Sequence, residues 1–378
     1  MNQYSLRVHD SKQPPPPTKP PSPWSGPNRL IGAAAVWSLV YGVIAILWTV
    51  TGRGYPLGEN DPHASSSLLG AVPADVGAPL FAAVALAGAG IGALMLRMTV
   101  VSRVGRVMII GFGMASAIGW MVIVPDSRAL ALVGYLPMVV VQAPFDAELR
   151  GEFVDTINGV YANHVAVLVG GFLWLAATVI FARRTAGRCE NCGRGRRHAA
   201  WTAPGAALRW GRIAVAVAVA VPALYALTRW TWIAGFPLGI DDETHAEGMA
   251  DGTLWAGAWL GSFALVGSIL TLGLVQRWGE VFPRWIPGLR GRRVPVMLAV
   301  IPASLVSALS VSAGLSMNKA GFADGMLRLT LDSWAVAGPA MLWPVWGVAL
   351  AAATYAYYLR RRDTCGVCGR GALTGQLP

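Results

Sequence analysis

Four cysteines, which are all the cysteines of the chain, have the spacing that most clearly indicates chemistry. They form two Cys-x-x-Cys-Gly-Arg-Gly elements, with Cys189 and Cys192 in the first and Cys365 and Cys368 in the second. This pattern is typical of a metal knuckle, a tight turn in which glycine lets amide hydrogens approach the sulfur atoms. Two knuckles that meet provide four thiolates in a tetrahedral arrangement, which suits Zn²⁺ first and a single iron ion second. The sequence therefore predicts a structural zinc site.

The same cysteines allow other interpretations. Arg188 and Arg194 stand beside the first pair and could lower a thiol pKa, so the two pairs could act as redox dithiols without a metal. Each knuckle could instead contribute to one of two separate sites that bridge a dimer. Structural disulfides are disfavoured, because we expect these cysteines to lie in a reducing cytosol.

Acidic residues and histidines form a second group of candidates. Two corresponding loops follow an aromatic-Pro-Leu-Gly element, and each contains an aspartate and a histidine; another aspartate and histidine border predicted spans. Such side chains can bind a divalent cation or perform acid–base chemistry. The alternatives are a solvated acidic loop and a hydrogen-bonded interface histidine. The candidates are Asp61, His63, Asp126, His164, Asp242 and His245.

The composition places these candidates in an all-α, polytopic membrane protein. Apolar residues make up 54% of the chain and charged residues 13%, and the 16 tryptophans and 45 glycines are also typical of membrane helices. Nearly charge-free stretches long enough to cross about 30 Å of hydrocarbon predict eight spans. They lie at about 31–51, 78–96, 107–124, 164–182, 212–228, 253–275, 294–312 and 334–358.

The distribution of charge orients these spans. If both termini lie in the cytosol, the inner segments hold most of the 30 Lys and Arg residues, and the outer segments hold most of the 19 Asp and Glu residues. This bias indicates a multipass protein of the plasma membrane with cytosolic termini. The basic residues are then topological signals and not a nucleic-acid surface. Residues 129–143 are apolar but too short to span, and we expect an interfacial or re-entrant helix on the outer side.

The sequence also indicates an internal duplication. The cysteine elements and the aromatic-Pro-Leu-Gly elements are each repeated at nearly the same offset, so whole halves correspond. We predict two parallel four-helix repeats, at 27–200 and 201–378, each ending in a knuckle. Because each repeat has an even number of spans, both knuckles lie on one side of the membrane. Residues 1–26 are rich in proline and predict a disordered tail.

One part of the chain resembles a known group of proteins. The run from Leu272 to Gly288, which continues to Pro295, and the run from Arg229 to Gly239 are similar to stretches in hypothetical multipass membrane proteins of high-GC actinobacteria. The resemblance covers about residues 225–300. It implies an origin and a membrane topology, but no activity.

Absent motifs limit the possible functions. There is no P-loop, HExxH, GxSxG or dinucleotide fingerprint. No charged residue falls in the middle of a predicted span, where ion-coupled carriers usually keep one. Three hypotheses remain: a permease or small-molecule-binding protein with a path between the repeats, an enzyme acting on a lipid-like substrate at the outer face, and a metal- or redox-responsive scaffold. The lipid bilayer is the expected partner; the oligomeric state is not predicted.

Overall fold

The structure, a computed structural model, is all-helical. It describes residues 26–371 apart from 59–60, 148–149, 152, 154–158, 196–198, 324–329, 331–332 and 363. Helix accounts for 74% of the structure, and the described residues contain no strand. Their only β-type pairing is an isolated bridge between Val281 and Arg293. The predicted disordered tail lies outside the described residues, except for Gly26.

Seven helices of the described chain are long and apolar enough to cross a membrane. Six of them are α1 (Gly26–Thr51), α2 (Ala74–Arg97), α6 (Gly159–Arg184), α7 (Pro204–Ile233), α9 (Thr253–Leu272) and α10 (Val296–Ala323). The seventh is α3 (Arg103–Ile118) with its π-helical continuation η3 (Gly119–Ile123). The shorter elements are η2 (Ala64–Ser66), α4 (Ser127–Gln142), η4 (Ala200–Thr202), α8 (Asp242–Ala250) and η5 (Arg277–Gly279).

The eighth predicted span, 334–358, is divided into two helices. These are α11 (Trp334–Met341) and α12 (Trp343–Arg361), which meet at Leu342. Pro344 occupies the first turn of α12, where its missing N–H is tolerated, but its ring prevents a regular helix from continuing through this point. The described chain thus has seven continuous candidate spans where eight were predicted.

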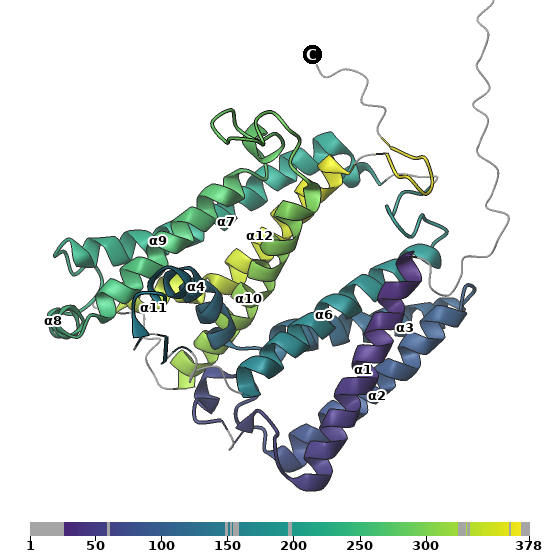
Figure 1. Cartoon of the computed structure of the whole chain (residues 1–378), viewed down its shortest axis with the longest axis horizontal. Helices are drawn as coiled ribbons and strands as arrows, with labels where there is room; N and C mark the ends of the chain where they lie inside the picture. Colours follow the sequence, from purple (N-terminus) through teal and green to yellow (C-terminus); the bar gives the residue numbers. More distant parts are fainter. Residues whose placement is uncertain are drawn as a thin grey trace, which may run out of the picture.

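The long helices form two bundles (Figure 1). In the first, α1 packs on α2 and on α6, and α3 packs on α6. In the second, α7 packs on α9 and on α12, and α10 packs on α12. In each bundle, therefore, the first long helix along the chain packs on the second and on the fourth, and the third packs on the fourth.

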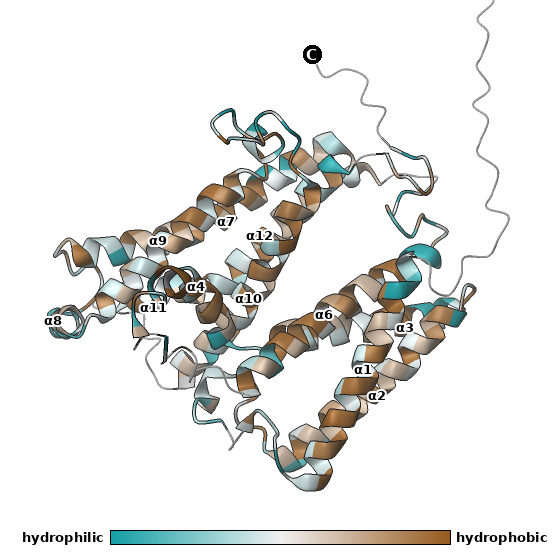
Figure 2. Ribbon diagram, viewed as in Figure 1, coloured by the Kyte–Doolittle hydropathy of each residue, from teal (hydrophilic) through white to brown (hydrophobic). Residues whose placement is uncertain are grey.

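The bundles have an apolar core that also contains several polar side chains, and many apolar side chains remain exposed on their outer faces. On α1, Val36 is 60% exposed and Leu47 is 56% exposed, whereas Ser38 is fully buried and accepts a hydrogen bond from Trp174. Hydrophobic residues cover the middle of the helices, and hydrophilic residues gather toward their ends (Figure 2). Such outer faces suit hydrocarbon and not water.

The segment 129–143, predicted as an outer interfacial or re-entrant insertion, is mostly α4. It belongs to the first half of the chain, but it packs on α10 and α9 of the second bundle. Two side chains of α10 also join the bundles, at the end of the molecule where α4 lies. Ser312 on α10 donates to the carbonyl of Pro125 at 2.7 Å, and Lys319 donates to the carbonyls of Ser67 and Leu68 at 3.0 Å each.

One charged side chain is buried within a described candidate span, just beyond the predicted end of the fifth span at residue 228. Arg229 belongs to α7 and is only 8% exposed. Its guanidinium lies 4.4 Å from the Tyr225 ring and 4.2 Å from the Trp232 ring, and it donates to the carbonyl of Ala335 at 2.9 Å. Aromatic faces and carbonyl oxygens therefore compensate this buried charge near the end of α7 that lies away from the cysteine elements.

Candidate metal centre

Each cysteine knuckle is a tight turn closed by two backbone hydrogen bonds. In the first, the amide of Cys189 donates to Arg194 at 3.1 Å and the amide of Gly193 donates to Cys189 at 2.8 Å. In the second, Cys365 donates to Arg370 at 2.9 Å and Gly369 donates to Cys365 at 2.8 Å. The two turns therefore have the same backbone pattern.

The glycine after each second cysteine is required by the backbone. Gly193 has φ +72° and Gly369 has φ +66°, values that glycine adopts without the strain that a side chain would cause. This left-handed residue turns the chain back, so that both cysteines of a knuckle face the same side.

The first knuckle is fixed to the end of α6. Arg183 donates to the carbonyls of Glu190 and Asn191 at 3.1 and 3.0 Å, and Arg184 forms a 2.8 Å ion pair with Glu190. The corresponding arginines of α12, Arg360 and Arg361, bind different partners. Arg360 pairs with Glu280 and Arg361 donates to the carbonyl of Val294, so they hold the loop between α9 and α10.

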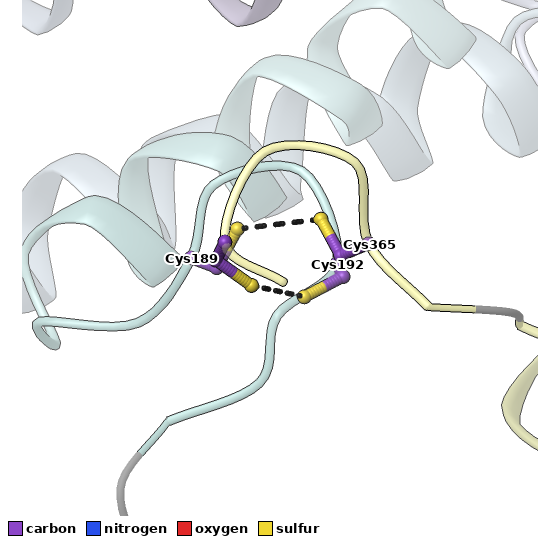
Figure 3. A group of neighbouring side chains, drawn as sticks. Cys189, Cys192 and Cys365 are labelled. Carbon is purple, nitrogen blue, oxygen red and sulfur yellow. Dashed lines mark hydrogen bonds between the residues drawn. The ribbon is translucent and has the colours of Figure 1, made fainter. Parts of the chain in front are cut away.

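Arginines join the two knuckles directly. Arg194 donates to the carbonyls of Arg370 and Arg362, at 2.7 and 2.9 Å. In return, Arg362 donates to the carbonyl of Cys192 at 2.9 Å and Arg370 donates to that of Arg194 at 3.3 Å. The exchange is reciprocal, and it places the two turns face to face (Figure 3).

This arrangement brings the four cysteine sulfurs together. Cys189 Sγ lies 3.9 Å from Cys365 Sγ, Cys192 Sγ lies 3.6 Å from Cys368 Sγ, and all four atoms lie within 4.8 Å of one another. Four sulfurs around a Zn²⁺ ion at about 2.3 Å stand about 3.8 Å apart, so these two pairs already have the spacing of a metal-centred tetrahedron. The cysteines are free thiols.

The electrostatics of the cluster also suit a cation. Burial opposes ionisation of the Cys365 thiol, but amide groups of Cys368 and Val367 and the neighbouring thiols lower its pKa to about 6. Burial and the adjacent sulfur atoms raise the pKa of Cys368 to about 12. One thiolate forms readily, whereas all four together require a positive ion. The same donors fit Zn²⁺ and a single iron ion.

The structure also brings three of the sequence candidates together at the opposite end of the first bundle. Arg128 in the first turn of α4 donates to both carboxyl oxygens of Asp61, at 2.8 and 2.6 Å, and also to Asp126. His164 Nε2 lies 3.5 Å from Asp126 Oδ2. Asp61, Asp126 and His164 are buried, and the Arg128 side chain is 13% exposed.

Both carboxyl groups of this outer cluster are held in the ionised form. Burial raises the pKa of Asp61, but hydrogen bonds from Arg128 and the His63 amide outweigh it and lower the pKa below its usual value. Burial likewise opposes ionisation of Asp126, whereas contacts with His164 and Arg128 lower its pKa. The cluster therefore ties together the loop after α1, the start of α4 and the start of α6.

The remaining candidates are not part of this cluster. His63 is exposed, and only its backbone amide contacts Asp61. In the second half, Asp242 is exposed on α8, and His245 Nε2 lies 2.9 Å from the carbonyl of Trp232. The repeated loops therefore have different structures. The sequence candidates omitted Arg128; its signal is an arginine two residues after Asp126, in a segment where most of the charged residues are acidic.

Comparison with known proteins adds no relative, because no family model, curated protein or solved structure matches the chain. The fold itself defines the class. In the described part of the chain, seven long apolar helices with apolar outer faces are those of a multipass integral membrane protein. Within it, four cysteines from distant parts of the chain form a cluster that could bind a metal.

Metal analysis of cysteine variants tests the cluster. We expect the purified protein to carry a single metal ion per chain, and we expect both Cys189→Ser/Cys192→Ser and Cys365→Ser/Cys368→Ser to lose it, since neither pair completes the site. Val367→Ser changes the exposed residue between two of the cysteines and should keep the ion. Acidification should release the metal, because protons compete for the thiolates. Full metal retention by either double variant would show that the knuckles bind separately.

Removing the Arg128 charge tests the outer cluster. Arg128→Gln leaves two buried carboxylates without their cation and should cost about 3–5 kcal/mol of unfolding free energy at neutral pH. The loss should shrink as the pH falls, because the unpaired carboxyls can then be protonated; in the wild type their lowered pKa values keep this stabilisation until more acidic pH. Arg53→Gln, at an exposed outer residue, should change stability by less than about 0.5 kcal/mol. A similar, pH-independent effect of both variants would contradict the assignment.

Proposed function

We propose that the chain consists of two parallel four-helix repeats, at 27–200 and 201–378, in the plasma membrane with both termini in the cytosol. In this proposal α11 and α12 together form the eighth span, broken at Leu342. The matching order of helix contacts in the two bundles supports the duplication, and so do the equal hydrogen bonds of the two knuckles. The excess of arginine at the knuckle end supports the orientation.

We further propose that a structural Zn²⁺ ion, held by Cys189, Cys192, Cys365 and Cys368, joins the repeats at the cytosolic face. The spacing of the sulfur atoms supports this assignment. When bound, the ion supplies charge compensation and a fixed tetrahedral geometry. Arg194 and Arg362 fix the backbone of the two turns and also offset the negative charge that four thiolates leave on a divalent ion.

The function that this architecture supports best is that of a permease or small-molecule-binding protein with its path between the repeats. The observation that carries the proposal is the location of the contacts between the bundles. They lie at the two ends, through the knuckles on one side and through α4, Ser312 and Lys319 on the other. A protein that changes access between bundles needs this kind of separable end contact.

The energies indicate which end opens. A structural zinc site contributes about 10–16 kcal/mol. A neutral hydrogen bond such as that of Ser312 contributes about 0.5–1.5 kcal/mol, and one from a charged donor such as Lys319 about 1.5–3 kcal/mol. On this comparison of polar contacts the bundles would pivot about the metal clamp and separate at the outer face, a movement that also requires α4 to leave α10 and α9.

Two other functions have a specific observation in their favour. An enzyme acting on a lipid-like substrate at the outer face is supported by the convergence of Asp61, Asp126 and His164 beside a surface pocket of about 380 Å³. Arg128 occupies both carboxylates, which favours a structural role for them. A redox-responsive scaffold is supported by free thiols only 3.6 and 3.9 Å apart.

Distance measurements across the outer face test the permease proposal. Dyes on noncanonical residues at the exposed positions 65 and 253 report the separation of the bundles and leave the cysteines intact. We expect Ser312→Ala/Lys319→Met to shift single-molecule energy transfer toward longer distances, because the outer hydrogen bonds are lost. Ser310→Ala removes a buried hydroxyl that bonds only within α10, and it should cause no shift. Unchanged distances in the double variant would indicate a rigid pair of bundles and favour the outer-face enzyme.

A further inference from the structure

A pocket at the knuckle end of the second bundle is not used by the proposed mechanism. It has a volume of about 410 Å³ and lies where η4 meets the first turns of α7. Its lining is mostly apolar, with one guanidinium. The lining residues are Ala200, Trp201, Ala206, Arg209, Trp210 and Ile213.

Aromatic side chains give this pocket a fixed wall. Trp210 Nε1 donates to the carbonyl of Trp201 at 3.1 Å, which holds η4 against α7. The ring of Tyr355 on α12 lies 6.2 Å from that of Trp201 and 6.5 Å from that of Trp210, and it stacks on Tyr358. Trp201 nevertheless remains 55% exposed and Tyr355 42% exposed. Rings that are packed together and still exposed are typical of the interface between headgroups and hydrocarbon.

Charge and hydrophobicity are separated along the same face of α7. Arg209 and Arg212 are one helical turn apart, and both are exposed. Ile213 and Val217 follow toward the middle of the helix and are 69% and 37% exposed. A ligand that covers this face must therefore be anionic at one end and apolar beyond it. A soluble anion would contact only the charged end of this face, whereas a lipid would contact both Arg209 and the exposed Ile213 and Val217.

We propose that this pocket binds an anionic phospholipid. The phosphate lies against Arg209 and Arg212, and an acyl chain runs past Trp201 and along Ile213 and Val217. Two guanidinium groups select an anionic over a zwitterionic headgroup, as basic pockets between membrane helices do. The inference depends on the proposed topology only in assigning the lipid to the inner leaflet.

Native mass spectrometry of the full chain tests this binding. The protein is released from nanodiscs that contain equal amounts of phosphatidylglycerol and phosphatidylcholine in both leaflets, so the result does not depend on orientation. We expect selective retention of phosphatidylglycerol by the wild type, and a loss of that selectivity by about tenfold in Arg209→Gln/Arg212→Gln. The control Arg103→Gln/Arg277→Gln removes two other exposed arginines and should retain the lipid.

The outcomes separate this inference from the permease proposal. Equal retention by the variant and the wild type, or an equal loss in the control, would overturn the lipid site and leave the bundle geometry untouched. Displacement of the lipid by glycerol phosphate at millimolar concentration would show a site for free phosphate compounds and would also overturn it. All four arginines are exposed, so bound metal and thermal unfolding should be unchanged in both variants.

Discussion

The convergence of four cysteine sulfurs is the constraint on which the rest of the structure depends. Each half of the chain carries only two thiols, so neither half can complete a tetrahedral site alone. The knuckles can meet only if they lie on the same side of the membrane. Hydrogen bonds that arginines exchange between the two turns, which follow α6 and α12, are consistent with this condition.

The two halves of the chain match at one end of the molecule and differ at the other. Within the two knuckle turns, corresponding residues make corresponding backbone bonds, although the arginines that precede the turns on α6 and α12 hold different partners. At the other end the halves differ. Arg128 gathers two carboxylates in the first half, whereas Arg229 in the second half lies between two aromatic rings and donates to carbonyl oxygens. The two ends of the described structure therefore differ in symmetry, since the knuckle turns match in their bonds and the opposite ends do not.

Local signals in the sequence account for much of the fold. Hydropathy over about 20 residues locates the long helices, and repeated spacing predicts that Cys189 meets Cys365. Contacts between distant residues carry no such signal, so neither the pairing of Arg128 with Asp61 nor the packing of α4 on α10 was predicted. The break at Leu342 has a local cause in Pro344, which stands in the first turn of α12, but hydropathy alone joined the two helices into one predicted span. The likeness of the two outer loops was misleading, because Asp241 caps α8 and leaves Asp242 exposed.

The most direct test of the central claim is X-ray absorption spectroscopy at the edge of the metal that copurifies with the full chain. A single ion shared by both knuckles predicts four sulfur neighbours at about 2.3 Å and no metal neighbour. Two sulfur neighbours with nitrogen or oxygen atoms completing the shell would contradict the account, because each knuckle would then hold its own ion and the two halves would not be joined through it.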